Sequence, residues 1–160
     1  HLCDRRQRQM CIRDRTQIVG EFSEKAEANQ LEMVVECPQP PVEIYVDGRH
    51  LWRIIDNLMG NICKYAQPGT RVYITLEKFH GMVIMTFRNI SKDRLKMTSE
   101  ELFGRFVRGD SSRNTEGHGL GLSIAKSLTE LMHGNLAVQM DGDLFKVILS
   151  FEEYQEDKKQ

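Results

Sequence analysis

The chain has 160 residues, of which 40% are hydrophobic, and its 22 Lys and Arg nearly balance its 23 Asp and Glu. This composition describes one soluble globular domain with a core of its own. The net charge of -1 gives no global reason to expect nucleic acid, and no apolar run approaches the roughly 18 residues of a membrane span. We therefore expect neither nucleic acid nor direct membrane contact for this chain.

The cysteines and the start of the chain favour a reducing compartment. The cysteines are irregularly spaced and form no C-x-x-C pair, so they indicate neither a zinc site nor a disulfide framework. The first residues are charged and lack the apolar centre of a signal peptide. We therefore expect a cytoplasmic domain, and a membrane anchor of the parent protein would lie outside this fragment.

Residues 1–15 differ in composition from the rest of the chain. The stretch HLCDRRQRQMCIRDR carries five Arg and few residues that form a core. Two interpretations are open: a non-native remnant of cloning or sequencing, or the frayed end of an upstream helix. We expect this segment to carry no function.

The first half of the chain predicts two helices and two strands. Residues 17–28 are expected to end a helix, and residues 31–36 to form a strand because apolar and polar side chains alternate there. Three prolines precede a short strand expected at 42–46. Asp47 stands at the N-cap of a long helix that runs to about Ala66, where a Gln-Pro-Gly sequence ends it.

The second half predicts two β-hairpins with helices and polar loops between them. The helices are expected near residues 98–106 and 120–133, the second stopped by Gly134. The first hairpin turns at His80-Gly81. The four strands are expected at residues 71–78, 82–88, 135–140 and 144–151.

The helix after Asp47 has two faces of different composition. At about 100° per residue, one face is an apolar stripe of Leu51, Ile55, Leu58, Ile62 and Tyr65. A polar stripe, about 120° away, consists of His50, Arg53, Asn57, Asn61 and Lys64. Asn is a poor residue inside a helix because its amide competes for the backbone, and a solvated face would favour Glu, Lys or Gln. On this helix alone, a ligand-binding face and a wet surface both stay open.

Alternating glycines stand directly before the predicted helix at 120–133. Gly117, Gly119 and Gly121 would let the backbone approach an anion, and the free N–H groups at a helix start attract negative charge. This arrangement indicates a phosphate cradle. The G-x-G-x-G pattern alone is weak, since alternating glycines also occur in ordinary loops, and it fits neither the Walker nor the dinucleotide spacing.

Three blocks in this order resemble the catalytic, ATP-binding domain of bacterial sensor histidine kinases. RIIDNLMGNICKYA is similar to the asparagine box, LFGRFVRGDSSR to the phenylalanine box, and GHGLGLSIAKSLTELMHGNL to the second glycine box. The likeness extends from Thr16 to Tyr154. These domains belong to an ATPase superfamily with type II topoisomerases, a heat-shock chaperone and mismatch-repair proteins.

The resemblance implies an α/β two-layer sandwich. A mixed sheet of about five strands would be covered on one face by three helices, with ATP held between the helices and a mobile lid. The catalytic domain is expected at residues 31–155. Residues 16–30 would be the end of a linker helix from a missing dimerisation domain, and residues 156–160 a polar tail.

On the asparagine box, the resemblance assigns Asn61 to the Mg²⁺ that bridges the ATP phosphates. It assigns Asn57 to a catalytic and nucleotide-binding place on the same face. Mg²⁺ prefers oxygen ligands and keeps several waters, so an amide oxygen with phosphate oxygens would form a suitable shell. Lys64 resembles the basic residue that contacts the phosphates, and Tyr65 the aromatic residue beside the nucleotide. For Tyr65 we favour a core role, because its angle falls within the apolar stripe.

The other boxes imply the remaining contacts. Arg105 and Arg108 match basic positions whose guanidinium groups can neutralise the transferring phosphoryl group, although packing is the plainer role for Arg105. Phe103 and Phe106 are expected as hydrophobic anchors, and residues 109–116 as the lid. The second glycine box implies nucleotide contacts by Gly117, His118, Gly119, Leu120 and Gly121, with His118 contributing its backbone.

One box departs from the family pattern. The first glycine box normally reads D-x-G-x-G after a strand, whereas Asn89 and Ser91 occupy the places of the Asp and the first Gly here. The family's Asp accepts a hydrogen bond from the adenine amino group. An Asn oxygen can also accept it, but without the charge that strengthens such bonds. We favour a variant that still binds ATP over one with impaired affinity.

The phosphoacceptor histidine of these kinases lies on an upstream helical hairpin, which does not fit before Thr16. The partners implied are therefore ATP, this dimerisation domain, through which the full-length protein forms a homodimer, and a response regulator. Two alternatives are a degenerate nucleotide-binding or scaffolding domain and a related ATPase or serine kinase of the same superfamily.

Overall fold

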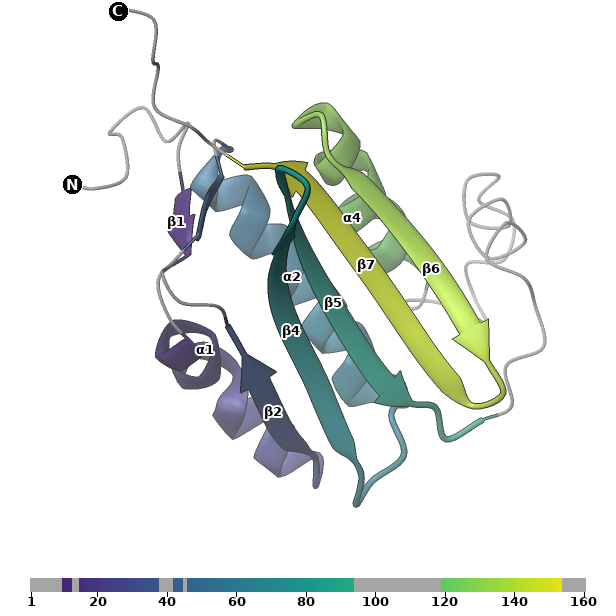
Figure 1. Ribbon diagram of the computed structural model, residues 1–160. Helices are drawn as coiled ribbons and strands as arrows, with labels where there is room; N and C mark the ends of the chain where they lie inside the picture. Colours follow the sequence, from purple (N-terminus) through teal and green to yellow (C-terminus); the bar gives the residue numbers. More distant parts are fainter. Residues whose placement is uncertain (1–9, 13–14, 38–41, 45, 94–118, 154–160) are drawn as a thin grey trace, which may run out of the picture.

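The computed structural model describes residues 10–12, 15–37, 42–44, 46–93 and 119–153. In this part of the chain, three helices lie against one face of a five-stranded sheet (Figure 1). The helices are α1 (Arg15–Ala28), α2 (Gly48–Tyr65) and α4 (Gly119–Leu131). The expected two-layer α/β sandwich is confirmed.

The sheet is mixed, and its strands follow the order β2-β4-β5-β7-β6. The pair of β2 and β4 is parallel, whereas the three other pairs are antiparallel. The hairpins expected from the sequence are present, each with slightly longer strands. The strand bounds are Glu32–Glu36 (β2), Arg71–Phe79 (β4), Met82–Ile90 (β5), Asn135–Asp141 (β6) and Leu144–Glu152 (β7).

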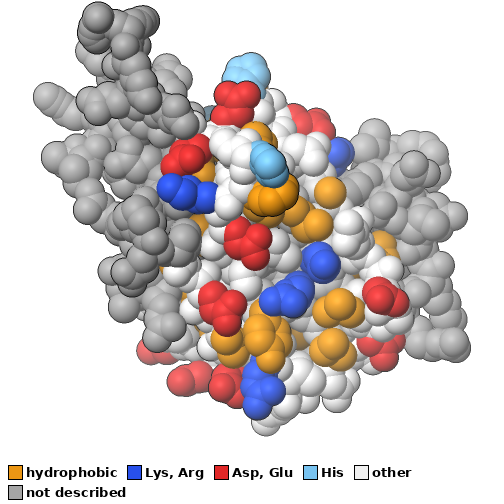
Figure 2. Space-filling model, in the orientation of Figure 1, with side chains coloured by type: hydrophobic (Ala, Val, Ile, Leu, Met, Phe, Trp, Pro, Cys, Tyr) orange, Lys and Arg blue, Asp and Glu red, His pale blue; other side chains and the backbone are white. Residues whose placement is uncertain are grey.

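The core lies between the sheet and the helices. Side chains on β5 and β7 alternate strictly, with Val83, Met85 and Phe87 among those buried against the helices. The uncovered face of the sheet carries hydrophobic, basic and acidic side chains intermixed (Figure 2). One face thus supplies the core, which is why the helices need to cover only that face.

Helix α1 contributes to the same core. Phe22 and Ala26 are 4% and 1% exposed, and the Phe22 ring centroid lies 5.9 Å from that of Trp52 on α2. The helix expected to end a linker therefore packs on the domain and belongs to its core. Its continuation into an upstream dimerisation helix stays a prediction.

A two-stranded sheet precedes α2. Strand β1 (Met10–Ile12) pairs antiparallel with β3 (Val42–Ile44), and Met10 is opposite the buried Ile44. Residues 10–12, which belong to the N-terminal segment of unusual composition, thus pair with the domain. The origin of residues 1–15 stays a prediction.

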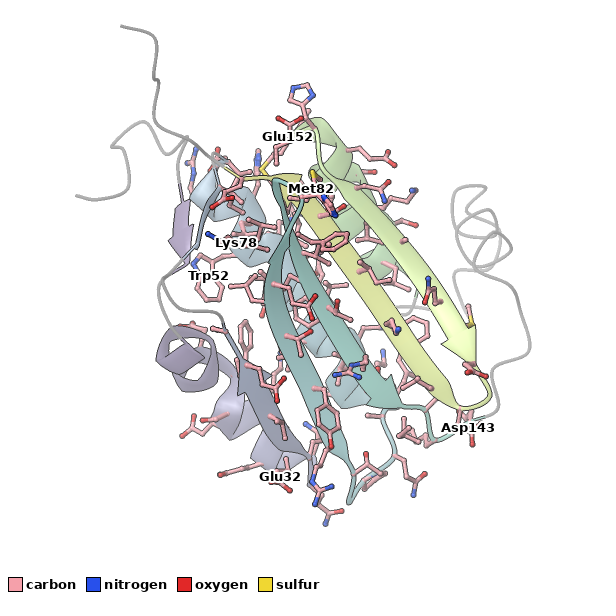
Figure 3. All side chains as sticks on the ribbon, in the orientation of Figure 1. Glu32, Trp52, Lys78, Met82, Asp143 and Glu152 are labelled. Carbon is pink, nitrogen blue, oxygen red and sulfur yellow. The ribbon has the colours of Figure 1, made fainter. Side chains whose placement is uncertain are left out.

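The two ends of the main sheet are distinct. Met82 pairs with Glu152 at one end, and Asp143 lies in the β6–β7 turn at the other (Figure 3). Helix α2 ends at this second end, because the Ser91 N–H after β5 donates to the Asp143 carbonyl and the Lys92 N–H to the Tyr65 carbonyl. The helix expected near residues 98–106 lies outside the described residues. No helix in the described part of the chain is long and apolar enough to cross a membrane.

Candidate functional site

Helix α2 is fixed to the sheet along its apolar stripe. Leu51, Ile55, Leu58 and Ile62 are all at most 3% exposed, as the sequence predicts. Because this stripe faces the sheet, the polar stripe lies on another side of the helix, next to α4. The packing of α2 therefore decides where the two asparagines stand.

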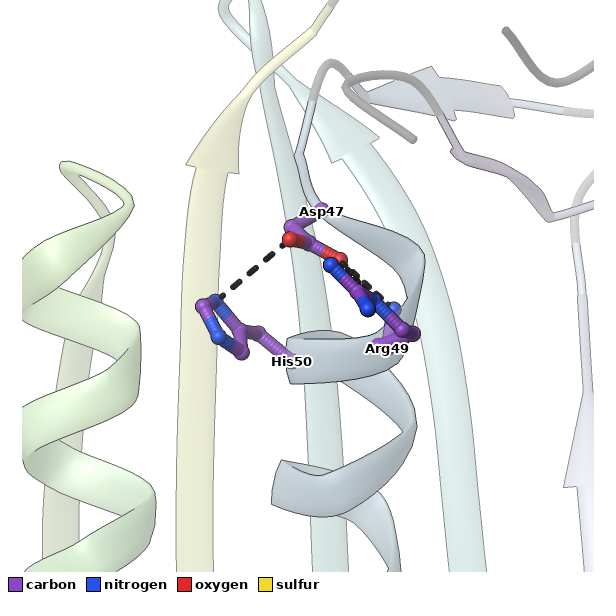
Figure 4. A network of polar contacts seen from close by, with 3 residues as sticks. All are labelled: Asp47, Arg49 and His50. Atoms are coloured by element: carbon purple, nitrogen blue, oxygen red, sulfur yellow. Dashed lines mark hydrogen bonds and ion pairs between the residues drawn. The ribbon is translucent and has the colours of Figure 1, made fainter. Parts of the chain in front are cut away.

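Asp47 caps the start of α2, as predicted. Its Oδ1 accepts a hydrogen bond from the Arg49 N–H at 2.9 Å, and its carboxylate also lies near the Arg49 guanidinium and the His50 ring (Figure 4). Partial burial disfavours the charged form, but the Arg49 hydrogen bonds and the His50 charge outweigh it and lower the pKa of Asp47. The cap fixes the helix start at the end far from Asp143.

Asn57 and Asn61 stand one turn apart on the polar stripe. Asn61 is only 7% exposed, and Asn57 is half-buried. Within the described residues, neither the Asn57 Nδ2 nor the Asn61 Oδ1 has a hydrogen-bond partner, although both atoms are buried. A buried amide without partners costs free energy, so these atoms indicate a ligand face rather than a wet surface.

The Asn61 Oδ1 and the Asn57 Nδ2 have complementary chemistry. The Asn61 Oδ1 is an acceptor of the kind that Mg²⁺ uses, and the Asn57 Nδ2 is a donor that suits a phosphate oxygen. Among the residues described, no cluster of three His, Cys, Asp or Glu side chains could hold a metal by itself. A metal shared between one amide and phosphate oxygens needs no such cluster, so the residues present fit the expected ion.

Lys64 and Tyr65 lie at the end of α2. The Lys64 side chain is exposed, with its Nζ 5.7 Å from the centroid of the Tyr65 ring. Tyr65 is half-buried and is therefore not fully enclosed in the core, the role that its angle favoured. Its backbone carbonyl holds the chain after β5. Both side chains thus stand where α2 meets the end of β5.

Asn89 lies on the helix-facing side of β5, near its end. It is 4% exposed and is paired in register with Phe145 of β7. Ser91 is also buried, forms a bridge with Ala66 at the end of α2, and accepts a hydrogen bond from the Asp93 N–H through its Oγ. The two residues that replace the family's Asp and Gly are therefore brought to the same end of α2 as Tyr65.

Helix α4 begins beside Asn57. A Cβ added to Gly121 would lie 3.9 Å from the Asn57 backbone oxygen, so the first turn of α4 passes close to the polar stripe. Gly119 and Leu120 form the start of this helix, where unpaired N–H groups attract anions. The Ser123 Oγ, directly after this turn, is a further buried atom that lacks a partner among the described residues. The sequence pattern did not single it out, because a serine near the start of a helix is ordinary.

Four expected site residues lie outside the described residues: Arg105, Arg108, Gly117 and His118. The two phenylalanines and the expected lid fall in the same range. The described part thus brings together Asn57, Asn61 and the start of α4, and joins the end of α2 to Asn89. The roles assigned to all these residues stay predictions.

The chain is similar in sequence to known sensor kinases. The sensor histidine kinase RppB of Synechocystis is 32% identical over 145 residues, an overlap of 87% of this chain and 32% of RppB. The chain thus spans about a third of that relative's length. The probable sensor protein PcoS of Escherichia coli is 39% identical over 107 residues, which cover 64% of this chain and 23% of PcoS.

Solved structures show the same fold. The catalytic domain of the histidine kinase ThkA superposes with a TM-score of 0.71 at 20% identity, covering 86% of this chain and 88% of that one. Residues 46–155 match the family described as histidine kinase-, DNA gyrase B-, and HSP90-like ATPase. Since this match covers most of the chain, including α2, Asn89 and α4, the chain belongs to that ATPase family.

Proposed function

We propose that this domain binds Mg-ATP between α2, the end of β5 and the start of α4, and transfers the γ-phosphoryl group to a histidine on a separate dimerisation domain. The observation that carries the proposal is the pair of buried amide atoms on Asn57 and Asn61, beside the first turn of α4, that have no hydrogen-bond partner among the described residues. RppB, a relative of this chain, is named a sensor histidine kinase, which supports the transfer to histidine in two-component signalling.

Each residue has a defined task in this proposal. Asn61 ligates Mg²⁺ through its Oδ1, and Asn57 donates from its Nδ2 to a phosphate oxygen. Lys64 neutralises phosphate charge, and the start of α4 receives phosphate at its free N–H groups. When bound, the metal offsets the negative charge of the phosphates. The Asn89 oxygen accepts from the adenine amino group, while Arg105 and Arg108 act on the transferring group.

The proposal also defines partners. The acceptor histidine lies on the dimerisation domain of a homodimer, and the phosphoryl group then passes to a response regulator. A solved histidine kinase, ShkA, is described in complex with AMPPNP, and it has the same fold, with a TM-score of 0.70 at 22% identity. The match covers 89% of this chain and 30% of the ShkA chain.

The test is phosphoryl transfer to a supplied acceptor. The full chain is joined to a dimerisation hairpin that carries a phosphoacceptor histidine, and Mg-ATP labelled at the γ-phosphate is added. We expect phosphate that is labile in acid and stable in alkali, and no label with Asn61→Ala. Asn135→Ala, an exposed change on β6, should label like the unchanged protein. Absence of label in the unchanged protein, despite Mg-ATP binding, would contradict transfer.

A second candidate, a nucleotide-binding domain without transfer activity, is favoured by Asn89 and Ser91 in the first glycine box. It predicts nucleotide binding and no label in the same assay. Label on serine instead of histidine would indicate a related serine kinase. The transfer assay therefore separates the three functions.

A further inference from the structure

Arg53 is a cation on the polar stripe of α2 that has no role in the function proposed so far. Its side chain is exposed. Four other basic residues of the described chain form ion pairs with acidic side chains: Arg49 with Asp47, Arg71 with Glu32, Lys78 with Glu153 and Lys126 with Glu130. For Arg53, no ion pair is formed with any described residue. This positive charge is therefore available to an anion.

The groups of the candidate site follow a fixed order along α2. Ala66 bridges Ser91 at one end, which places the buried Asn89 and the expected base contact there. Asn61 and then Asn57 follow towards the helix start, and successive positions four residues apart are about 6 Å apart along the axis. Arg53 is the next residue in this series. If the base of a nucleotide lies at Asn89, its phosphates therefore extend along α2 towards Arg53.

The start of α4 indicates where the phosphates stop. Its first turn, with Gly121 against Asn57, lies beside the second half of this series. Phosphates held by the N–H groups of that turn would occupy the space beside Asn61 and Asn57. The last phosphate would then be the one nearest Arg53, whose long side chain spans about one helical turn.

Two turns further along α2, the side of the helix that carries Arg53 has a glycine. Gly60 lies on the same side of α2, about 20° from Arg53. A Cβ on Gly60 would have the Lys25 Nζ, at 4.0 Å, as its nearest neighbour. No side chain at position 60 therefore separates Arg53 from Lys64, and the nearby Lys25 ammonium adds positive charge.

We propose that Arg53 contacts the terminal phosphate of the bound nucleoside triphosphate and so distinguishes it from the diphosphate. The inference rests on the proposed nucleotide site, to which it adds a residue that recognises the γ-phosphoryl group. A guanidinium can donate two parallel hydrogen bonds to phosphate oxygens. Because the contact is made with the terminal phosphate only, ADP loses it.

The test measures the affinity of the full chain for two nucleotides. Calorimetric titrations with Mg-ATP and Mg-ADP are made on the unchanged protein and on Arg53→Gln. We expect Mg-ATP to bind about tenfold more weakly to the variant, as for one lost charged hydrogen bond, and Mg-ADP to bind as before. Arg53→Lys should recover part of the loss. Arg71→Gln removes an equal charge from the start of β4 and should alter neither affinity.

The outcomes separate this inference from the proposed function. An equal loss of Mg-ATP and Mg-ADP affinity in Arg53→Gln would show a general charge effect and overturn the contact with the terminal phosphate. Unchanged affinities for both nucleotides would overturn it as well. In either case the nucleotide site itself would stand. Failure of the unchanged protein to bind Mg-ATP would instead reject the proposed function, and this inference with it.

Discussion

The two faces of α2 differ in how many of their side chains find packing or hydrogen-bond partners in the rest of the described protein. The inner face, with Leu51 and Leu58 at 0% and 2% exposure, is filled by the sheet and its neighbours. The outer face holds the buried Asn57 Nδ2 and Asn61 Oδ1, which find no partner in the described chain. The same helix thus has one face completed by folding and another that a ligand would complete. Stability and binding should therefore respond to different substitutions.

The largest effect is expected on the inner face. Leu58→Ala leaves a cavity between α2 and the sheet, so the free energy of unfolding should fall by about 3 kcal/mol. Urea denaturation followed by circular dichroism measures this change. A loss below about 1 kcal/mol would mean that this face is packed less tightly than its burial indicates.

A second effect distinguishes two glycines. A Cβ on Gly134 would lie 2.5 Å from the Phe151 ring, so Gly134→Ala should lower the free energy of unfolding by about 2 kcal/mol. Gly20 on α1 has no atom within 4 Å of such a Cβ, so Gly20→Ala should raise stability by about 0.5 kcal/mol. Urea denaturation of both variants tests the pair, and equal effects would contradict the close approach at Gly134.

The cap of α2 should show a dependence on pH. Asp47→Ala removes the N-cap and should cost about 1 kcal/mol at neutral pH. The pKa of Asp47 is lowered in the folded state, so its charge stabilises the fold above the ordinary value of 3.8. That contribution is lost as the pH falls through the folded pKa. Denaturation of both proteins at several pH values should therefore show a difference that shrinks in acid, and a constant difference would contradict the role of the charge.

A further effect concerns the base contact. If the Asn89 oxygen accepts from adenine, Asn89→Asp should tighten ATP binding by about 1 kcal/mol, because a charged acceptor forms the stronger bond. GTP presents a carbonyl at that position and should bind relatively more weakly to the variant. Competition binding with ATP and GTP on both proteins checks this. Unchanged affinities would mean that Asn89 does not touch the base.

The sequence predicted those features that depend on local periodicity. The two stripes of α2 follow from helical spacing, and the strands of both hairpins follow from alternation. Long-range pairing was not predictable in the same way. Strand β1 has three residues, too few to carry an alternation, and α1 has only Phe22 and Ala26 on its buried side within the described side chains. The linker role expected for residues 16–30 came from the family resemblance, and two buried residues gave too weak an apolar pattern to indicate a core helix.

For the candidate site, the sequence predicted which residues belong to it, but not the surroundings of their side chains. Sequence spacing placed Asn57 and Asn61 on one face, but it did not reveal that an atom of each is buried without a partner. That property depends on the approach of α4. The end of the α4 helix also differs from expectation: His133, with a φ of 66°, adopts the left-handed conformation, whereas Gly134 is needed for its close approach to Phe151.

The most direct test of the contrast between the faces is Asn61→Ala, studied by calorimetry with Mg-ATP and by urea denaturation. Because the Asn61 Oδ1 has no described partner, the free energy of unfolding should change by less than about 0.5 kcal/mol. Mg-ATP binding should fall below detection, while Asn135→Ala should leave it intact. A folded Asn61→Ala protein that binds Mg-ATP with unchanged affinity would contradict the assignment of this face to the nucleotide.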